Sequence, residues 1–292
     1  HRDLHLSIRR QRQMCIRDSV KSIFIIKKIK PDVVFSTGGY VTLAPALASY
    51  ILSIPLFIHE QNSIPGLVNR ILNRLSKLTF EAFPDSFNKS SKIHTVGNPV
   101  RSGIIKNPET EAKKKEHFNI LILGGSQGSK QLNEIVLKAF KDKVIPSYWR
   151  IVHQTGDLDK SSIVDIYSKQ SFSYEVVSYI EDIGRAYHES DLVVGRSGAM
   201  TVSEICCSSK PSILFPLPWA ADNHQYFNAK FLEDKKASIL LESSLDRADK
   251  LLALLNDLEK DHNARHSMSL NAFDAFPVSS GKRIVEIINE SF

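Results

Sequence analysis

The chain has 292 residues, of which 42% are hydrophobic and 24% are charged. This balance excludes extensive disorder and provides enough core material for two α/β domains or one large one. Three cysteines, Cys15, Cys206 and Cys207, have no metal-ligand spacing, and the adjacent pair is poorly placed to form a disulfide, which indicates a reducing compartment.

Positive charge is concentrated in the first part of the chain. Residues 1–106 hold 16 Lys and Arg against 6 Asp and Glu, whereas the remainder holds 22 against 26. The first part is therefore expected to face phosphate, anionic lipid or nucleic acid, unless it forms a solvated basic surface. The most apolar stretch, Leu43–Ile58, is short for a bilayer span and contains Pro45 and Pro55, so any membrane role is predicted to be peripheral.

Strands and helices alternate after His1–Ser19, an Arg-rich stretch without clear periodicity. Asn107–Glu116 is polar and charged, and is the best linker candidate. Two alternating series about a linker predict two Rossmann-like domains with parallel sheets, residues 20–106 and 117–270, then a C-terminal segment, 271–292. The predicted strands are 31–36, 55–59, 78–82, 94–96, 119–123, 150–154, 172–177, 192–194, 212–215 and 238–241. The predicted helices are 20–30, 43–52, 66–77, 131–140, 183–189, 201–207, 225–234, 247–260 and 284–289.

A glycine-rich loop, Gly124–Gly128, joins a predicted strand to a predicted helix. Its backbone N–H groups and the helix dipole suit an anion, and Ser126 can donate its hydroxyl to a phosphate. The loop lacks the Lys of a P-loop, and the next strand runs into Gln154 rather than an acidic residue. ATP hydrolysis and dinucleotide-dependent dehydrogenation are therefore disfavoured, although a tight turn that binds nothing is also compatible with the pattern.

Ser36–Tyr40 is a second strand–glycine–helix junction, in the first predicted domain. Ligands of such folds lie at the carboxyl ends of strands, in the cleft between domains. Two glycine loops facing each other there would suit a diphosphate-bearing substrate on each side, although either loop can instead be a packing turn.

Polar segments follow several other predicted strands. In Arg196–Glu204, the start of a helix offers N–H groups to phosphate, and Glu204 can accept both hydroxyls of a ribose or merely complement the helix dipole. Asp222, His224 and Gln225 suit sugar hydroxyls, with a surface loop capped by Asp222 as the simpler alternative. The quartet His59–Asn62 requires buried partners, and Arg101 is placed to face a phosphate near the hinge.

In this order, the segments resemble those of the MurG family of bacterial transferases, from about Val20 to the C-terminus. The matching stretches are PDVVFSTGGYVTLAPALAS, IPLFIHEQNSIPGLVNR, VGNPVR, ILILGGSQGSKQLN, HQTG, DLVVGRSGAMTVSE and DNHQYFNAKFLE. The resemblance implies an α/β fold of the GT-B class, with two Rossmann-like domains whose sheets face across a cleft. It implies an inverting transfer of N-acetylglucosamine from UDP-N-acetylglucosamine to the C4 hydroxyl of a lipid-linked muramyl-pentapeptide, without a cofactor or a bound metal.

The resemblance also implies the residues of the donor site. Asn62 and Arg101 reach the donor, Ser126 contacts the diphosphate, Ile180 frames the uracil through its backbone, and Gln225 holds sugar hydroxyls with His224 beside it. The residues that it implies for binding phosphate and ribose are Ala199, Met200, Thr201, Val202, Ser203 and Glu204. The candidate acceptor loop comprises Thr37, Gly38, Gly39, Tyr40, His59 and Glu60.

The family begins with a strand and a Gly-Gly-Thr-Gly-Gly-His loop, which is absent from this sequence. The first domain is therefore expected to be incomplete, His1–Ser19 to be a sequencing or assembly artefact, and activity to be weak or absent. The catalytic residue is left unassigned, and the ionisable candidates for a general base are Asp85, Glu60 and His59.

Two alternatives remain: a different enzyme on the same fold, such as a UDP-N-acetylglucosamine 2-epimerase, and a chain that binds UDP-sugar without transferring it. Ser36–Tyr40 and His59–Asn62 favour the peptidoglycan enzyme over the first. The predicted partners are the donor, the lipid-linked acceptor and the anionic cytoplasmic face of the cell membrane, with no nucleic acid. Arg70, Arg74 and Lys77, with Ile71, Leu72 and Leu75, would face the membrane unless that apolar face packs into the core.

Overall fold

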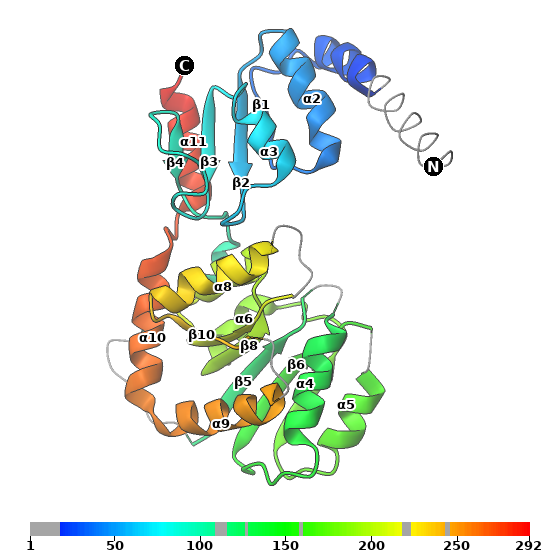
Figure 1. The fold of residues 1–292 in the computed structure, drawn as a ribbon, viewed down its shortest axis with the longest axis vertical. Coiled ribbons are helices and arrows are strands. Elements are labelled where there is room, and N and C mark those ends of the chain that lie inside the picture. Colours follow the sequence, from blue (N-terminus) through cyan, green and yellow to red (C-terminus); the bar gives the residue numbers. More distant parts are fainter. Residues whose placement is uncertain (1–17, 109–115, 126–127, 158–159, 218–222, 243–245) are drawn as a thin grey trace. The chain divides into compact units, whose positions relative to one another are not determined.

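The structure is a computed structural model that describes residues 18–108, 116–125, 128–157, 160–217, 223–242 and 246–292. The chain divides into two compact units, His1–Val96 and Gly97–Phe292. Each unit is built on its own parallel sheet (Figure 1).

The first unit has a four-stranded sheet in the order β1-β2-β3-β4, so each connection moves one strand further in the same direction. All residues of the inner strand β2 are buried, as expected for a parallel strand covered on both faces. The core of this unit includes Leu56, Ile58 and Leu72. Its elements are a helix at 18–29, β1 (Val34–Ser36), α2 (Tyr40–Ile51), β2 (Leu56–Glu60), α3 (Leu67–Leu72), β3 (Leu78–Glu81) and β4 (Ile93–Thr95).

Helix α3 is shorter than the predicted helix at 66–77, because polar side chains compete with its backbone. Thr79 donates its hydroxyl to Oδ1 of Asn73 at 2.8 Å, and Ser76 donates its hydroxyl to the Asn73 carbonyl at 3.1 Å. Such local bonds offer the chain an alternative to another helical turn. The chain then enters β3, with the Lys77 N–H bonded to the Leu56 carbonyl.

The second unit has a six-stranded sheet in the order β10-β9-β8-β5-β6-β7, and every pair is parallel. The strand order reverses between β5 and β8, and in open α/β sheets ligands bind outside the carboxyl ends of strands at that point. The strands are β5 (Phe118–Leu123), β6 (Trp149–Gln154), β7 (Ser173–Val177), β8 (Leu192–Arg196), β9 (Ser212–Phe215) and β10 (Ser238–Leu240).

Helices cover this second sheet, with α4 packed against α9 and α10 against α7 (Figure 1). The core includes Ile120, Val136, Trp149 and Leu255. Helices α5 and α10 have no counterpart among the predicted elements. The helical elements are η1 (Ser102–Ile104), α4 (Lys130–Phe140), α5 (Lys160–Tyr167), α6 (Ile183–Glu189), α7 (Ala199–Cys207), α8 (His224–Asp234), α9 (Arg247–Lys260), α10 (His262–Ala275) and α11 (Ser280–Glu290).

Candidate functional site

The glycine loop leaves the carboxyl end of β5 and leads into α4. Gly128 has a φ of +77°, and a Cβ added there would lie 2.3 Å from the Thr155 carbonyl oxygen. Only glycine therefore fits this close approach of two backbones. Ser129 caps α4, its hydroxyl oxygen accepting from the Leu132 N–H. The predicted diphosphate contact, Ser126, lies outside the described residues.

Gln154, at the end of β6, joins this loop to the predicted uracil-binding turn. Its Nε2 donates to the Gly125 carbonyl at 2.9 Å, and its Oε1 accepts from the Ile180 N–H at 3.1 Å. Because the Ile180 N–H is already bonded, the carbonyl is the backbone group of Ile180 that a ligand could use. Gln154 was not among the predicted site residues, because its role depends on a contact with a residue far along the chain.

The start of α7 presents N–H groups at the carboxyl end of β8. Gly198 caps the helix without a side-chain hydrogen bond, and the first bond along the helix runs from the Val202 N–H to the Gly198 carbonyl. The N–H groups of Ala199, Met200 and Thr201 precede that bond, so helix geometry leaves them without an acceptor inside the helix. These three N–H groups, with the helix dipole, suit a phosphate.

Two of the predicted phosphate and ribose residues, Val202 and Ser203, are buried. Ser203 donates its hydroxyl to the Ala199 carbonyl at 2.8 Å and accepts from Nδ2 of Asn98 at 2.9 Å. The side chains of Val202 and Ser203 therefore serve packing and support the helix start, so the candidate ligand groups of α7 are those of its first turn and Glu204.

Glu204 is half-buried one turn further along α7. Its Oε2 accepts from the hydroxyl of Tyr187 at 3.1 Å. Burial raises the pKa of Glu204, while the Tyr187 hydrogen bond and the charge of Arg101 oppose that rise. Arg101 itself is exposed and immediately precedes η1.

Arg196, at the end of β8, connects the remaining parts of the site. Its Nη1 donates to the Ser129 hydroxyl at 2.9 Å, and its Nε and Nη2 donate to Oε1 of Gln225 at 3.2 and 3.1 Å. Oε1 of Gln225 also accepts from the Leu217 N–H at 3.0 Å. The amide oxygen of Gln225 is thus occupied by the protein, and its NH₂ group is the part of the amide that could serve a ligand. His224 is half-buried at the start of α8, and Asp222 lies outside the described residues.

In the first unit, Glu60 holds the loop that follows β2. Oε1 of Glu60 accepts from the backbone N–H and from Nδ2 of Asn62, at 3.0 and 3.3 Å. Oε2 of Glu60 accepts from the Gly66 N–H at 3.0 Å and from Nδ2 of Asn69 at 2.9 Å. Four donors on one buried carboxylate fix the conformation of this loop and the position of Asn62.

Asn69 also connects this loop to the candidate acceptor loop. Its Nδ2 donates to the His59 carbonyl at 3.1 Å, and a Cβ added at Gly38 would lie 2.8 Å from that nitrogen. Thr37, Gly39 and Tyr40 are exposed at the start of α2.

The three candidate general bases differ in their surroundings. His59 and Glu60 are 2% exposed, with His59 Nδ1 lying 3.2 Å from Nε2 of Gln61. Asp85 is exposed and pairs with Lys89 at 3.2 Å.

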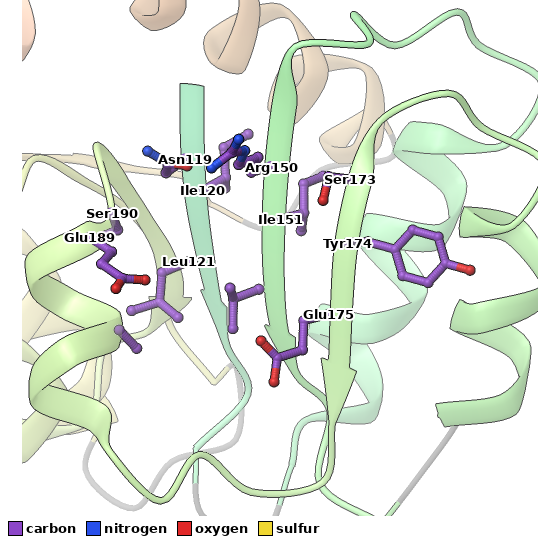
Figure 2. A pocket seen from close by; sticks show the side chains of 12 residues that line it. Asn119, Ile120, Leu121, Arg150, Ile151, Ser173, Tyr174, Glu175, Glu189 and Ser190 are labelled. Carbon is purple, nitrogen blue, oxygen red and sulfur yellow. The ribbon is translucent and has the colours of Figure 1, made fainter. Parts of the chain in front are cut away.

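A hollow of about 320 Å³ opens on one face of β5, β6 and β7, away from the residues considered above. Figure 2 shows Arg150, Glu175 and Glu189 around it. Its lining lies along the first halves of these strands, whereas the predicted site lies at their carboxyl ends. None of the predicted site residues lines this hollow.

Within each unit, the candidate groups lie where parallel strands end. The second unit brings together the glycine loop, the Ile180 turn, the start of α7 and Gln225, each at the carboxyl end of a strand. In the first unit, the loops that follow β1 and β2 carry Gly38 and Asn62.

Comparison with known proteins identifies these two units. The C-terminal domain of glycosyltransferase family 28 matches residues 119–284, and the N-terminal domain of that family matches residues 7–80. A UDP-N-acetylglucosamine–N-acetylmuramyl-(pentapeptide) pyrophosphoryl-undecaprenol N-acetylglucosamine transferase of Coxiella burnetii is 40% identical over 261 residues, covering 87% of this chain and 73% of that protein.

Solved structures agree with this result. MurG of Acinetobacter baumannii is similar with a TM-score of 0.81 and 32% identity, over 95% of this chain and 80% of that one. A UDP-GlcNAc 2-epimerase of Neisseria meningitidis, solved with UDP-GlcNAc bound, has a TM-score of 0.67 at 14% identity, over 96% of this chain and 81% of that one. The epimerase shares the fold alone, so fold does not separate the two enzyme classes but sequence does. The predicted α/β fold of the GT-B class is confirmed, and the chain belongs to glycosyltransferase family 28 and, within it, to the MurG family.

Proposed function

We propose that the chain transfers N-acetylglucosamine from UDP-N-acetylglucosamine to the C4 hydroxyl of undecaprenyl-pyrophosphoryl-MurNAc-pentapeptide, with inversion, in peptidoglycan synthesis. The observation that carries the proposal is the start of α7. There the N–H groups of Ala199 to Thr201 and the residue Glu204 lie within about one and a half turns of the same helix. That spacing suits a nucleoside diphosphate, and the named transferase of Coxiella burnetii supplies the sugar and the acceptor.

Each part of the donor has a matching group. The first turn of α7 and the glycine loop would receive the diphosphate, and Glu204 would accept the ribose hydroxyls. The Ile180 carbonyl would accept from the N3–H of uracil. Since Oε1 of Gln225 is already occupied, its NH₂ group would donate to a sugar hydroxyl. Asn62 and Arg101 would complete the donor site.

The helix start would act on the leaving group during transfer. As the C4 hydroxyl oxygen of the acceptor bonds to the anomeric carbon, the bond from that carbon to the diphosphate oxygen breaks, and UDP takes the electron pair. The hydroxyl proton passes to a general base. Preorganised N–H groups at the start of α7 would stabilise the charge that develops on the diphosphate, without reorganising during the step.

We further propose that the first unit binds the anionic cytoplasmic face of the cell membrane. On α3, Leu67 is 55% exposed and Ile71 is 45% exposed, beside the exposed Arg70 and Arg74. The predicted apolar face is narrower than expected, because Leu72 is buried in the core of the unit. Apolar side chains bordered by basic ones suit the boundary between headgroups and acyl chains.

The described part of the chain contains no helix with the length and apolar character needed to span a bilayer. Sedimentation with vesicles tests surface binding. The double variant Leu67→Ser, Ile71→Ser should bind anionic vesicles more weakly than the wild type, while Val285→Ser, on an exposed position of α11, should not. Equal binding of the wild type to neutral and anionic vesicles would contradict the proposal.

Calorimetric titration with UDP-N-acetylglucosamine, followed by a transfer assay with a lipid-linked muramyl-pentapeptide, tests the activity. The expected result is binding and transfer. Binding without transfer would support the non-catalytic alternative, and absence of binding would overturn both readings. Formation of UDP-N-acetylmannosamine without an acceptor would indicate the epimerase instead.

A further inference from the structure

Tyr187 lies on α6 and is fully buried, and its hydroxyl donates to Oε2 of Glu204 at 3.1 Å. A buried phenol ordinarily satisfies its hydroxyl with a nearby acceptor, and a carboxylate is the strongest acceptor available in proteins. The contact joins two helices through residues that are 17 positions apart in the sequence. Because the Tyr187 hydroxyl bonds to Glu204, its effect on a ligand would pass through that carboxylate.

The same helix supports the turn that carries Arg101. A Cβ added at Gly184 would lie 2.5 Å from the Gly103 carbonyl oxygen, so α6 and η1 are in close backbone contact. Nε2 of His188 lies 3.1 Å from the Ile104 carbonyl oxygen. Helix α6 therefore packs against both η1 and the carboxylate of Glu204.

We infer that Tyr187 is a positioning residue that orients the Glu204 carboxylate and thereby makes the site select ribose over 2′-deoxyribose. The inference rests on the proposed function, in which Glu204 receives the ribose. With Oε2 held by the phenol, Oε1 is left for the hydroxyls of the sugar. A carboxylate that rotates freely would lose that directional preference, since hydrogen bonds weaken steeply when they are misaligned.

The groups around Glu204 define how its ionisation responds to Tyr187. Burial raises the pKa of Glu204, while the Tyr187 hydrogen bond and Arg101 lower it. On α7 itself, burial and the Glu204 charge raise the pKa of the Cys207 thiol, and Cys206 adds to the rise that burial causes in the pKa of Tyr187. Removing the phenol hydroxyl deletes a stabilising donor and leaves the burial in place, so the pKa of Glu204 should rise further.

The variant Tyr187→Phe tests the inference by calorimetric titration with UDP and with 2′-deoxy-UDP. UDP affinity should fall about tenfold, as expected for loss of a hydrogen bond to a charged group, and 2′-deoxy-UDP affinity should fall less. The acid limb of the pH profile for UDP affinity should move to higher pH. Tyr167→Phe is the matched control, because Tyr167 is another fully buried tyrosine of the second unit, whose hydroxyl lies 3.0 Å from Nδ1 of His153 instead.

Each outcome separates the inference from the proposed function. If wild-type protein does not bind UDP, the proposed function fails. If wild type binds UDP but Tyr187→Phe behaves like the Tyr167→Phe control, or loses both ligands in the same ratio, Tyr187 has only a packing role and the inference is overturned.

A second variant covers the case in which Tyr187→Phe does not fold. Site-specific replacement of Tyr187 by 3-fluorotyrosine keeps the ring and hydroxyl and makes the phenol a stronger donor. The acid limb of UDP affinity should then move to lower pH, and an unchanged limb would contradict the inference.

Discussion

Arg196 donates two hydrogen bonds to the same oxygen of Gln225, from Nε at 3.2 Å and from Nη2 at 3.1 Å. A third bond, from Nη1 to the Ser129 hydroxyl at 2.9 Å, reaches the cap of α4. One planar guanidinium thus joins the helix that follows the glycine loop to the helix that carries Gln225. The two helices belong to the same proposed donor site but follow different strands.

Replacing Arg196 by Lys should therefore raise the KM for UDP-N-acetylglucosamine by about tenfold, because an ammonium group cannot reproduce the planar fork that reaches both partners. Steady-state kinetics measures this change. Arg185→Lys is the control, since Arg185 is exposed and pairs only at the surface with Glu189. Equal kinetics in the two variants would show that Arg196 does not support the donor site.

Gly128→Ala should destabilise the second unit by about 2 kcal/mol or more. The added Cβ would meet the Thr155 carbonyl oxygen at 2.3 Å, and φ of +77° is unfavourable for any residue with a Cβ. Urea unfolding measures the loss. Gly103→Ala is the control, because a Cβ there has no neighbour within 4 Å. Similar free energies of unfolding for the two variants would contradict the predicted steric conflict.

The sequence predicted the elements whose local signals are strong. Three elements have the predicted bounds: Ile183–Glu189, Ser212–Phe215 and Arg247–Lys260. Asp182 precedes the first of these, α6, and caps it by accepting a hydrogen bond from the Arg185 N–H. Helix α10 is not predicted by the sequence pattern, because its apolar residues do not lie on one face of the helix. It packs against α7 instead.

Within the site, local pattern could identify Glu204 and Gln225 as candidates but not what holds them. Tyr187 and Arg196 act through side-chain contacts that span 17 and 29 residues, and Gln154 acts across 26 and 29 residues. Such contacts exist only after the parallel strands align their carboxyl ends. Periodicity describes one element at a time, so it cannot predict a hydrogen bond between two of them.

The stability of the second unit should fall as the pH is lowered from about 6.5 towards 3. Burial lowers the pKa of His153 from 6.5 to about 3. Between those values the unfolded chain binds a proton at this position and the folded chain does not, so protonation favours unfolding, by up to about 1.4 kcal/mol per pH unit. Urea unfolding between pH 7 and pH 4 should show a shallower dependence in His153→Gln than in the wild type. Parallel curves would show that other groups dominate acid unfolding.

Glu60→Gln should lower the stability of the first unit and weaken the proposed contact of Asn62 with the donor. The carboxylate accepts from Asn62, Gly66 and Asn69, and an amide would place its own NH₂ group against at least one of these donors. A buried mismatch of this kind costs about 1–3 kcal/mol. Because this carboxylate holds Asn62, which we propose to contact the donor, the KM for UDP-N-acetylglucosamine should also rise.

Glu81→Gln provides a matched comparison for that variant. Glu81 is a buried carboxylate at the end of the neighbouring strand β3, and it accepts from the Phe87 N–H at 3.1 Å and the Thr95 hydroxyl at 2.8 Å. Both variants should lower the free energy of unfolding by similar amounts, since both place an amide among several donors. Glu60→Gln should raise the donor KM more than Glu81→Gln, because Glu60 bonds to Asn62 directly, whereas Glu81 holds the loop from which Ser86 donates to the Asn62 carbonyl. An equal rise in the donor KM of both variants would show that the effect comes from general destabilisation of the first unit and not from the loop after β2.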